Sequence, residues 1–321
     1  MPLMREKRVE LNGMQVSIYM DVNRLERIQK SLPYRFLVRP VLSWLDKGGQ
    51  GRNGHQEGDG QVITPSPEQT KPDSPEAQVV YDRIAGVEWY HTLDLPHGVS
   101  TPGYVDHRKQ VDLYGLPKDM YGMRALDVAT YDGFWAFEME RRGAEVVAID
   151  VDSLEACDYP RRYQQHVLEQ MGDRKTGAGF RIARKLLGSS VERRIVNVYD
   201  LSLARLGTFD FAFISDLLLH LRDPALALEK VGSVVKPGGQ IIVAEPYSAE
   251  LDHFTQPLSR FGYAEALGWW QHSRATLKTM MWAAGFDDIE EISRFRLECK
   301  AAVPILKVVL TGRQGVAVPD A

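Results

Sequence analysis

Cysteine is scarce in this chain of 321 residues, which has only Cys157 and Cys299. The two are far apart, and neither lies in a Cys-x-x-Cys or Cys/His spacing, so neither a disulfide framework nor a zinc site is indicated. No metal site is expected, although a few dispersed oxygen ligands for Mg²⁺ would leave no readable spacing. Free thiols and an N-terminal segment without the apolar core of a secretory signal favour a cytoplasmic protein.

Long apolar runs and a strong excess of charge are also absent. No segment approaches the roughly 18 consecutive apolar residues that a membrane span needs. A net charge of −4 gives no global electrostatic case for binding nucleic acid. The chain is 44% hydrophobic and longer than one typical domain of about 100 to 200 residues, so it predicts a globular core with an appendage.

The composition divides the chain into four parts. Residues 48–78 are rich in Gly, Pro, Ser and charge, which predicts a flexible linker. Residues 1–47 predict an N-terminal helical extension of short basic amphipathic helices. Packing on the main domain, packing on a second subunit, and contact with an anionic substrate or membrane surface all stay open for it. Residues 79–122 predict a lid of helices and loops, and residues 123–321 predict the main domain.

Strands and helices alternate through the main domain, which predicts an α/β fold. A breaker, Lys236-Pro237-Gly238-Gly239, precedes the fifth strand, and the long connection 151–193 contains two helical pieces. The last two strands predict an antiparallel hairpin that closes a Rossmann-like sheet of seven strands. The expected strands are 124–129, 145–150, 194–198, 209–215, 239–244, 287–295 and 304–311.

The most informative segment is 125–150, which reads as one nucleotide-binding βαβ half-unit. A strand ends at Leu126-Asp127-Val128, a tight turn follows through Gly133, and an amphipathic helix leads to the second strand. Such a turn directs backbone N–H groups and a helix N-terminus at a ligand. Asp150, at the end of the second strand, can accept hydrogen bonds from both ribose hydroxyls of an adenosine.

The turn lacks the glycines that a dinucleotide site needs. Ala129, Tyr131 and Gly133 stand where a G-x-G-x-x-G pattern lets the backbone approach a pyrophosphate. S-adenosylmethionine carries no phosphate and requires acids for its ammonium group and ribose. Asp127, Asp132 and Asp150 meet that requirement, so we favour S-adenosylmethionine, with an ordinary ligand-free turn as the alternative.

Four segments together resemble a known family: "LDVATYDGFWAFEMERRGA", "GFRIARKLLGSSVERRIVNVYDL", "GTFDFAFISDLLLHLRDPALALEKV" and "WYHTLDLPHGVSTPG". Over roughly residues 85–300 the chain is similar to class I methyltransferases grouped with the bacterial tRNA wobble-uridine (5-oxyacetate pathway) methyltransferase and its small-molecule O-methyltransferase relatives. The resemblance implies S-adenosylmethionine as the cofactor and one crevice at the carboxyl ends of the strands.

The resemblance also implies a set of cofactor-binding residues, for whose acids helix capping or turn formation is the alternative role. The first strand and its turn contribute Asp127, Ala129, Thr130, Asp132, Gly133 and Trp135. The later strand ends contribute Asp150, Val151, Tyr199, Asp200, Ser215 and Asp216, with Tyr199 and Asp200 expected at the adenine.

One position departs from the tRNA enzyme, which uses a carboxylated S-adenosylmethionine. Its tyrosine before the histidine helps hold the extra carboxylate, whereas this chain has Leu219 before His220. Leucine cannot donate a hydrogen bond, and no upstream segment matches that enzyme's Arg-Lys-Gly-Pro-Phe stretch. The unmodified cofactor is therefore expected.

Histidine suits removal of the acceptor's proton, because its ordinary pKa of ~6.5 lies near neutral pH. His220 follows the fourth strand, where the methyl group should lie, and His91 and His253 are rival bases. A packed or capping histidine is the alternative for His220. Aromatic residues near these positions, such as Trp89 and Tyr247, could stack on an acceptor or simply fill the core.

We expect O-methylation of a hydroxyl on a saccharide, glycolipid or secondary metabolite. The main alternative is a tRNA wobble-uridine methyltransferase, with arginine and lysine side chains contacting phosphates. N- or C-methylation, a non-catalytic binding module and a homodimer also stay open.

Overall fold

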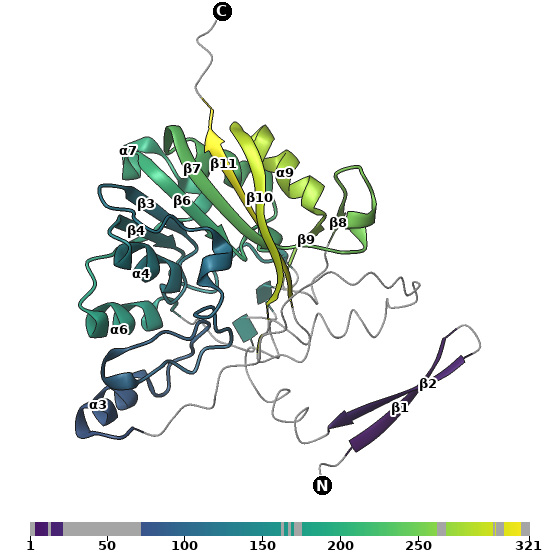
Figure 1. Cartoon of the computed structure of the whole chain (residues 1–321), viewed down its shortest axis with the longest axis horizontal. Helices are drawn as coiled ribbons and strands as arrows, with labels where there is room; N and C mark the ends of the chain where they lie inside the picture. The colour runs from purple at the N-terminus through teal and green to yellow at the C-terminus, as the bar shows by residue number, and fades with distance from the viewer. Residues whose placement is uncertain are drawn as a thin grey trace, which may run out of the picture.

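The computed structural model describes most of the chain after residue 71 (Figure 1). The described residues are 4–11, 14–21, 72–161, 164–165, 168–169, 175–261, 268–297, 299 and 305–315.

A mostly parallel sheet of seven strands in the order β10-β11-β7-β6-β3-β4-β5 forms the centre of the molecule. β6, β3, β4 and β5 run parallel to β7, whereas β11 runs antiparallel to both β7 and β10. The predicted Rossmann-like fold with its closing hairpin is confirmed. Its strands are β3 (Arg124–Val128), β4 (Glu145–Asp150), β5 (Glu192–Ile195), β6 (Phe209–Ser215), β7 (Val235–Pro246), β10 (Phe286–Leu297) and β11 (Ile305–Gln314).

Helices cover both faces of this sheet. One buried cluster joins it to α3 (Pro75–Ile84), α4 (Phe134–Arg141) and α6 (Ala178–Leu187). A second cluster joins the other face to α7 (Leu203–Leu206), α8 (Pro224–Gly232) and α9 (Arg274–Ala283). Both faces of the sheet are therefore shielded from solvent, which explains why the sequences of the central strands are nearly continuous apolar runs.

Alternation along the strands decides which side chains can reach a ligand on the α4 face. In β3, Ala125 packs in the first cluster and Leu126 and Val128 in the second. Since successive side chains of a strand point to opposite faces, Asp127 lies on the face of Ala125, under α4. It is a buried carboxyl between the apolar residues Leu126 and Val128, so its position calls for a polar partner.

The predicted breaker at residues 236–239 is wrong as a boundary, since β7 begins at Val235 and runs through it. The pairing with β6 shifts register there, from Phe209 opposite Val235 to Phe211 opposite Gln240. The Pro-Gly-Gly residues are accommodated as a bulge, with Gly238 at φ +75°. Strand β5 also ends at Ile195, earlier than the expected residue 198.

The predicted linker boundary at residue 78 also needs correction, because α3 already begins at Pro75. Ser74 caps that helix by accepting a hydrogen bond from the backbone N–H of Ala77. Beyond α3 the chain forms loops with two short 3₁₀ turns, η2 (Pro96–Gly98) and η3 (Val111–Tyr114). This part packs in the same cluster as α4 and α6.

The N-terminal extension is not helical over residues 4–21, where β1 (Met4–Leu11) and β2 (Met14–Asp21) pair antiparallel. The helices expected between residues 21 and 45 and most of the predicted linker lie outside the described residues. A small hairpin, β8 (Ser259–Phe261) with β9 (Trp270–His272), follows β7. Within the described residues no helix has both the length and the apolar character to cross a bilayer.

Candidate active site

A cavity of about 1150 Å³ opens at the carboxyl ends of β3, β4, β5 and β6, under the lid residues 86–104. This volume lies slightly above the roughly 300–1,000 Å³ of a common small-molecule pocket. Most of the residues predicted to bind the cofactor line it: Asp127, Ala129, Thr130, Asp132, Trp135, Asp150, Val151, Ser215 and Asp216. Gly133, Tyr199 and Asp200 are not among its lining residues.

The turn after β3 adopts a glycine-like backbone without the usual glycines. Ala129 has φ +62° and Tyr131 has φ +50°, in the left-handed region, and Gly133 follows at φ +96°. Hydrogen bonds hold the turn: Thr130 N–H donates to the Ile149 carbonyl over 3.1 Å, and Gly133 N–H donates to the Thr130 carbonyl over 2.8 Å. Left-handed backbone costs an alanine or tyrosine about 1–2 kcal/mol, and such strain concentrates at ligand sites.

Asp150, the last residue of β4, accepts hydrogen bonds from the turn after β3 and from the residue that follows it. Its Oδ2 accepts from the backbone N–H of Tyr131 over 2.8 Å, and its Oδ1 accepts from that of Val151 over 2.7 Å. Burial raises the pKa of Asp150, while the backbone N–H of Tyr131 and the charge of Arg193 oppose that rise. A carboxylate oxygen has two acceptor sites, so the group retains capacity for a ligand's hydroxyls.

Asp127 is a deeply buried acid of the cavity wall, at 2% exposure. Burial raises its pKa to about 7, with nearby His91 and the Thr130 hydroxyl opposing the rise. Its Oδ2 has no hydrogen-bond partner among the described residues. A buried carboxylate oxygen without a partner is costly, so this atom suits a cationic ligand group.

Tyr199 and Asp200, the residues expected at the adenine, follow the early end of β5 and are not among the lining residues of the cavity. Asn197 caps the short turn η4 (Val198–Asp200) by accepting from the Tyr199 N–H over 3.1 Å. The Tyr199 hydroxyl donates to Asp158, a lining residue, over 2.8 Å, but Tyr199 itself does not line the cavity. Asn197 and Val198 line the cavity instead, and sequence periodicity could not place this turn to within two residues.

His91 and Asp132 form a buried pair that sequence reasoning missed. His91 Nδ1 lies within hydrogen-bond distance of Asp132 Oδ1, and the backbone N–H groups of Tyr90 and His91 donate to Asp132 Oδ2 over 2.8 and 2.9 Å. Both side chains lie in the cavity wall, with exposures of 8% and 2%. Asp132 was expected among the cofactor-binding acids, and both of its oxygens contact the lid.

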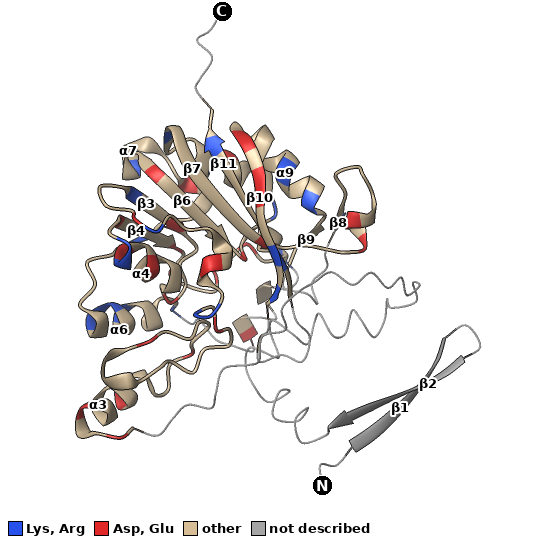
Figure 2. Ribbon diagram, viewed as in Figure 1, with Lys and Arg blue, Asp and Glu red and all other residues tan. Residues whose placement is uncertain are grey.

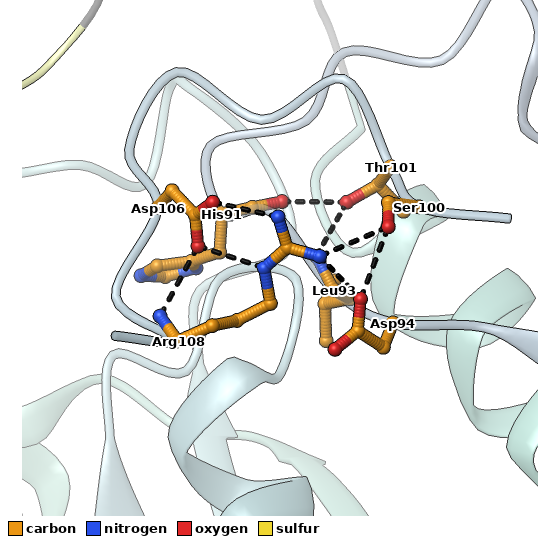
Figure 3. Close-up of polar contacts among 7 residues, drawn as sticks. All are labelled: His91, Leu93, Asp94, Ser100, Thr101, Asp106 and Arg108. Carbon is orange, nitrogen blue, oxygen red and sulfur yellow. Dashed lines mark hydrogen bonds and ion pairs between the residues drawn. The ribbon is translucent and has the colours of Figure 1, made fainter. Parts of the chain in front are cut away.

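The loop that carries His91 is braced by a network of polar contacts (Figure 3). The Thr101 hydroxyl donates to the His91 carbonyl over 2.7 Å and accepts from the Leu93 N–H over 2.8 Å. Behind it, the Arg108 guanidinium contacts Asp94 and donates to both oxygens of Asp106 over 2.8 and 2.6 Å. The His91 backbone is thus held at its carbonyl by Thr101 and at its N–H by Asp132, so the residue is preorganised.

Gly103 makes this arrangement sterically feasible. A Cβ atom there would lie 2.1 Å from the backbone carbonyl carbon of His91 and 2.2 Å from the nitrogen of Thr92. No side chain fits at such distances, and the approach allows Thr92 N–H to donate to the Val105 carbonyl over 2.8 Å.

The other two candidate bases occupy different positions. His220, at the end of the turn η5 (Leu218–His220), lines the cavity. His253, in η6 (Leu251–His253), is exposed and is not among the lining residues. The cavity therefore brings together His91 and His220 and leaves His253 outside.

The end of β6 carries a buried ion pair. Lys307 Nζ, from β11, lies 2.8 Å from Asp216 Oδ2, and Lys307 is fully buried. Lys307 is the one charged residue of the apolar run "VPILKVVL", which is the signal by which sequence reasoning could have found it.

A model of the methyltransferase domain family matches residues 108–291, more than half of the chain. This chain belongs to the methyltransferase domain family. Together with the seven-stranded fold, this makes the protein an S-adenosylmethionine-dependent methyltransferase.

Curated relatives of this methyltransferase include the "Ubiquinone biosynthesis O-methyltransferase" of Xanthomonas euvesicatoria pv. vesicatoria (strain 85-10), which is 29% identical over 39% of this chain and 44% of the relative. The protein of the same description from Xylella fastidiosa (strain 9a5c) is 27% identical over 46% of this chain and 52% of the relative. The matches span about half the length of these relatives.

Among solved structures, the N-terminal domain of EvdMO1 in the presence of SAH and D-fucose is 17% identical, with a TM-score of 0.48, over 75% of this chain and 97% of that one. The Burkholderia thailandensis 1,6-didemethyltoxoflavin-N1-methyltransferase, with its substrate and S-adenosylhomocysteine, is 16% identical with a TM-score of 0.39 over 61% of this chain and 72% of that one.

The cavity of this methyltransferase fits S-adenosylmethionine on its own evidence. The partnerless Oδ2 of Asp127 suits an ammonium group, and Asp150 lies one strand away, at the position for ribose hydroxyls. Six acidic side chains and one lysine are among the lining residues, a balance that favours a cationic cofactor: Glu88, Asp127, Asp132, Asp150, Asp158, Asp216 and Lys175.

Cofactor affinity should rise with pH if Asp127 holds the ammonium. With a pKa of about 7, the carboxyl is mostly protonated at pH 6 and mostly ionised at pH 8. The affinity should therefore increase about tenfold over this interval, measured by calorimetry with S-adenosylmethionine. Asp127→Asn should bind more weakly and lose this dependence. An equally steep profile in the Asn variant would contradict the assignment.

Gly103→Ala should displace the His91 loop and destabilise the fold by about 3 kcal/mol, because the new Cβ meets backbone atoms. Gly122→Ala is the control, since its Cβ meets open space and only the left-handed φ of +76° costs energy, about 1 kcal/mol. Chemical denaturation measures both. Equal losses of unfolding free energy would show that the tight approach at Gly103 does not matter.

Proposed function

We propose that this protein transfers the methyl group of S-adenosylmethionine to a hydroxyl of a small, uncharged acceptor, with His91 as the general base. The observation that carries the proposal is the buried pair of His91 and Asp132 in the wall of the cavity. The match to ubiquinone biosynthesis O-methyltransferases supports oxygen as the methylated atom.

Asp132 determines which nitrogen of His91 can act as the base. A carboxylate beside Nδ1 stabilises the tautomer with its proton on Nδ1, which leaves the lone pair on Nε2. The backbone N–H groups of Tyr90 and His91 also donate to this carboxylate, so the ring and its partner keep a fixed geometry. Asp132 is thus a positioning residue, and His91 Nε2 accepts the proton.

Proton removal is the task that this pair suits. When bound, S-adenosylmethionine supplies an electrophilic methyl group: the C–O bond forms as the C–S bond breaks, and the electron pair remains on sulfur. The hydroxyl proton of the acceptor passes to His91 Nε2, which makes the oxygen nucleophilic at neutral pH. A neutral amine already has an available lone pair and needs no base before it attacks, so the pair favours oxygen over nitrogen.

The charge of the cavity favours an uncharged acceptor over tRNA. Six acidic side chains and one lysine are among the lining residues, which disfavours phosphate, although the buried Lys307 pairs with one of these acids, Asp216. Figure 2 shows basic and acidic residues interspersed over the ribbon, with α6 bearing Arg181, Arg184 and Lys185 but no acid. One basic helix is also what a solvated face presents, so tRNA as the acceptor stays a prediction of the sequence alone.

His91→Ala should lower kcat by about 10²- to 10⁴-fold, because the acceptor loses its base. Cofactor affinity should stay within a factor of two, and Asp132→Asn should lower kcat in the same direction because the favoured tautomer is lost. Methyl transfer from labelled S-adenosylmethionine and calorimetry with the same compound measure the two quantities.

His97→Ala is the matched control, since His97 is exposed on η2 of the same lid and lies outside the cavity wall. Its kcat should equal that of the wild type. A fully active His91→Ala variant together with an inactive His220→Ala variant would transfer the role of base to His220.

A further inference from the structure

Further polar contacts fix the ion pair of Asp216 and Lys307 at the end of β6. Besides Asp216, Lys307 Nζ donates to the Ala244 carbonyl over 2.9 Å and lies 3.3 Å from the Ser215 hydroxyl. The lysine is fully buried, whereas the Asp216 side chain is 16% exposed and lines the cavity. Within this pair, Asp216 is therefore accessible from the cavity, whereas Lys307 is not.

The backbone around Asp216 is fixed in an unusual conformation. Asp216 has φ +55°, and its N–H donates to the Ala244 carbonyl over 3.2 Å. Glu245 accepts from the next two backbone N–H groups, those of Leu217 over 2.8 Å and Leu218 over 3.1 Å. Left-handed backbone in a non-glycine residue is strained, and here the neighbouring contacts maintain it.

The order of the strands places Asp216 beyond the cofactor. Asp150 and Asp127 end β4 and β3, where the ribose and the ammonium are proposed to bind, and β6 is the next strand on the far side of β3. Tyr90, His91 and Asp216 all line the cavity, and burial and then the charge of Asp216 raise the pKa of Tyr90. Asp216 thus shares the cavity with the lid residues Tyr90 and His91.

A second polar group in the cavity wall has no partner. Trp135 is 4% exposed and lines the cavity, and its Nε1 has no hydrogen-bond partner among the described residues. Its ring packs against those of Tyr114 and Phe213 at centroid distances of 4.2 and 4.7 Å, which fixes its orientation. A buried indole N–H normally finds an acceptor, so this one suits a ligand oxygen.

We propose that Asp216 and Trp135 form the acceptor subsite and that the acceptor is an uncharged polyhydroxylated ring, such as a sugar, a cyclitol or a catechol. One hydroxyl that does not react donates to Asp216, and another oxygen of the acceptor accepts from Trp135 Nε1. Lys307 is a positioning residue that holds the Asp216 carboxylate. This inference rests on the proposed function, since it names the acceptor of the same site.

The subsite also excludes a class of compounds. An acceptor with a carboxylate or phosphate in place of the second hydroxyl would face the Asp216 carboxylate at close range with no proton between them. Like charges in a water-poor site are strongly unfavourable, so such analogues should be rejected.

Methyl transfer to paired compounds tests the subsite. The panel contains neutral sugars, cyclitols and catechols, each beside a carboxylated analogue, with labelled S-adenosylmethionine as donor. The wild type should methylate neutral members and discriminate at least tenfold against their carboxylated partners in kcat/KM. Asp216→Asn should raise KM for the neutral acceptor about 10- to 100-fold with a much smaller change in kcat, because a hydrogen bond to a charged group is lost.

The matched control is Asp288→Asn. Asp288 also has a left-handed backbone, at φ +51°, but it is exposed on β10 and does not line the cavity. Asparagine adopts this conformation readily, so both variants should fold, and only the Asp216 variant should change KM.

A double-mutant cycle tests the role of Lys307. Lys307→Met should raise KM in the wild-type background and have little further effect when Asp216 is already Asn, because it acts through that carboxylate. A purely structural role for the pair would instead lower the unfolding free energy and leave KM unchanged in every background.

Two results would overturn the subsite. One is methylation that prefers the carboxylated compounds, or no methylation of any neutral member of the panel. The other is an unchanged KM in Asp216→Asn. Calorimetry with S-adenosylhomocysteine on the same samples distinguishes failure of the proposed function from failure of the subsite. If the wild type fails to bind that compound, the proposed function fails, whereas normal binding with either overturning result rejects only the subsite.

Discussion

The contact between Asp132 and His91 connects the two parts of the molecule on which the site depends. Asp132 belongs to the turn after β3, and His91 belongs to the lid, 41 residues earlier in the chain. Both carboxylate oxygens contact the lid, one through the imidazole and one through two backbone N–H groups. The turn that lines the cavity therefore also orients the proposed base. The proposed cofactor site and the proposed base are thus positioned by the same segment of backbone.

The same constraint explains the unusual turn. With Ala129 and Tyr131 in the left-handed region, the backbone retains the path that glycines would give, at a cost in strain energy. The hydrogen bonds from the turn to β4, including that of Tyr131 N–H to Asp150, help to hold it there. A Gly-poor turn is thus compatible with a cofactor site, because tertiary contacts supply what the local sequence lacks.

Local periodicity was sufficient to predict the fold, but not the pairings that complete the site. The strands of the sheet and the closing hairpin follow from apolar runs and their spacing. The bulge at Gly238 and the early end of β5 do not, since both depend on register against a neighbouring strand. Long-range partners were also out of reach: Asp132 was interpreted as a ligand of the cofactor because its lid contacts cannot be read from spacing. Lys307 was not predicted, although it is the one charged residue in an apolar run.

The most direct test of the account is the protonation of His91 itself. Long-range ¹H–¹⁵N correlation spectra of the histidine rings, at neutral pH with S-adenosylhomocysteine bound, distinguish the two neutral tautomers. The account predicts that His91 carries its proton on Nδ1 and that this resonance shifts or disappears in Asp132→Asn. A His91 ring with its proton on Nε2, or one indifferent to the Asp132 substitution, would contradict it.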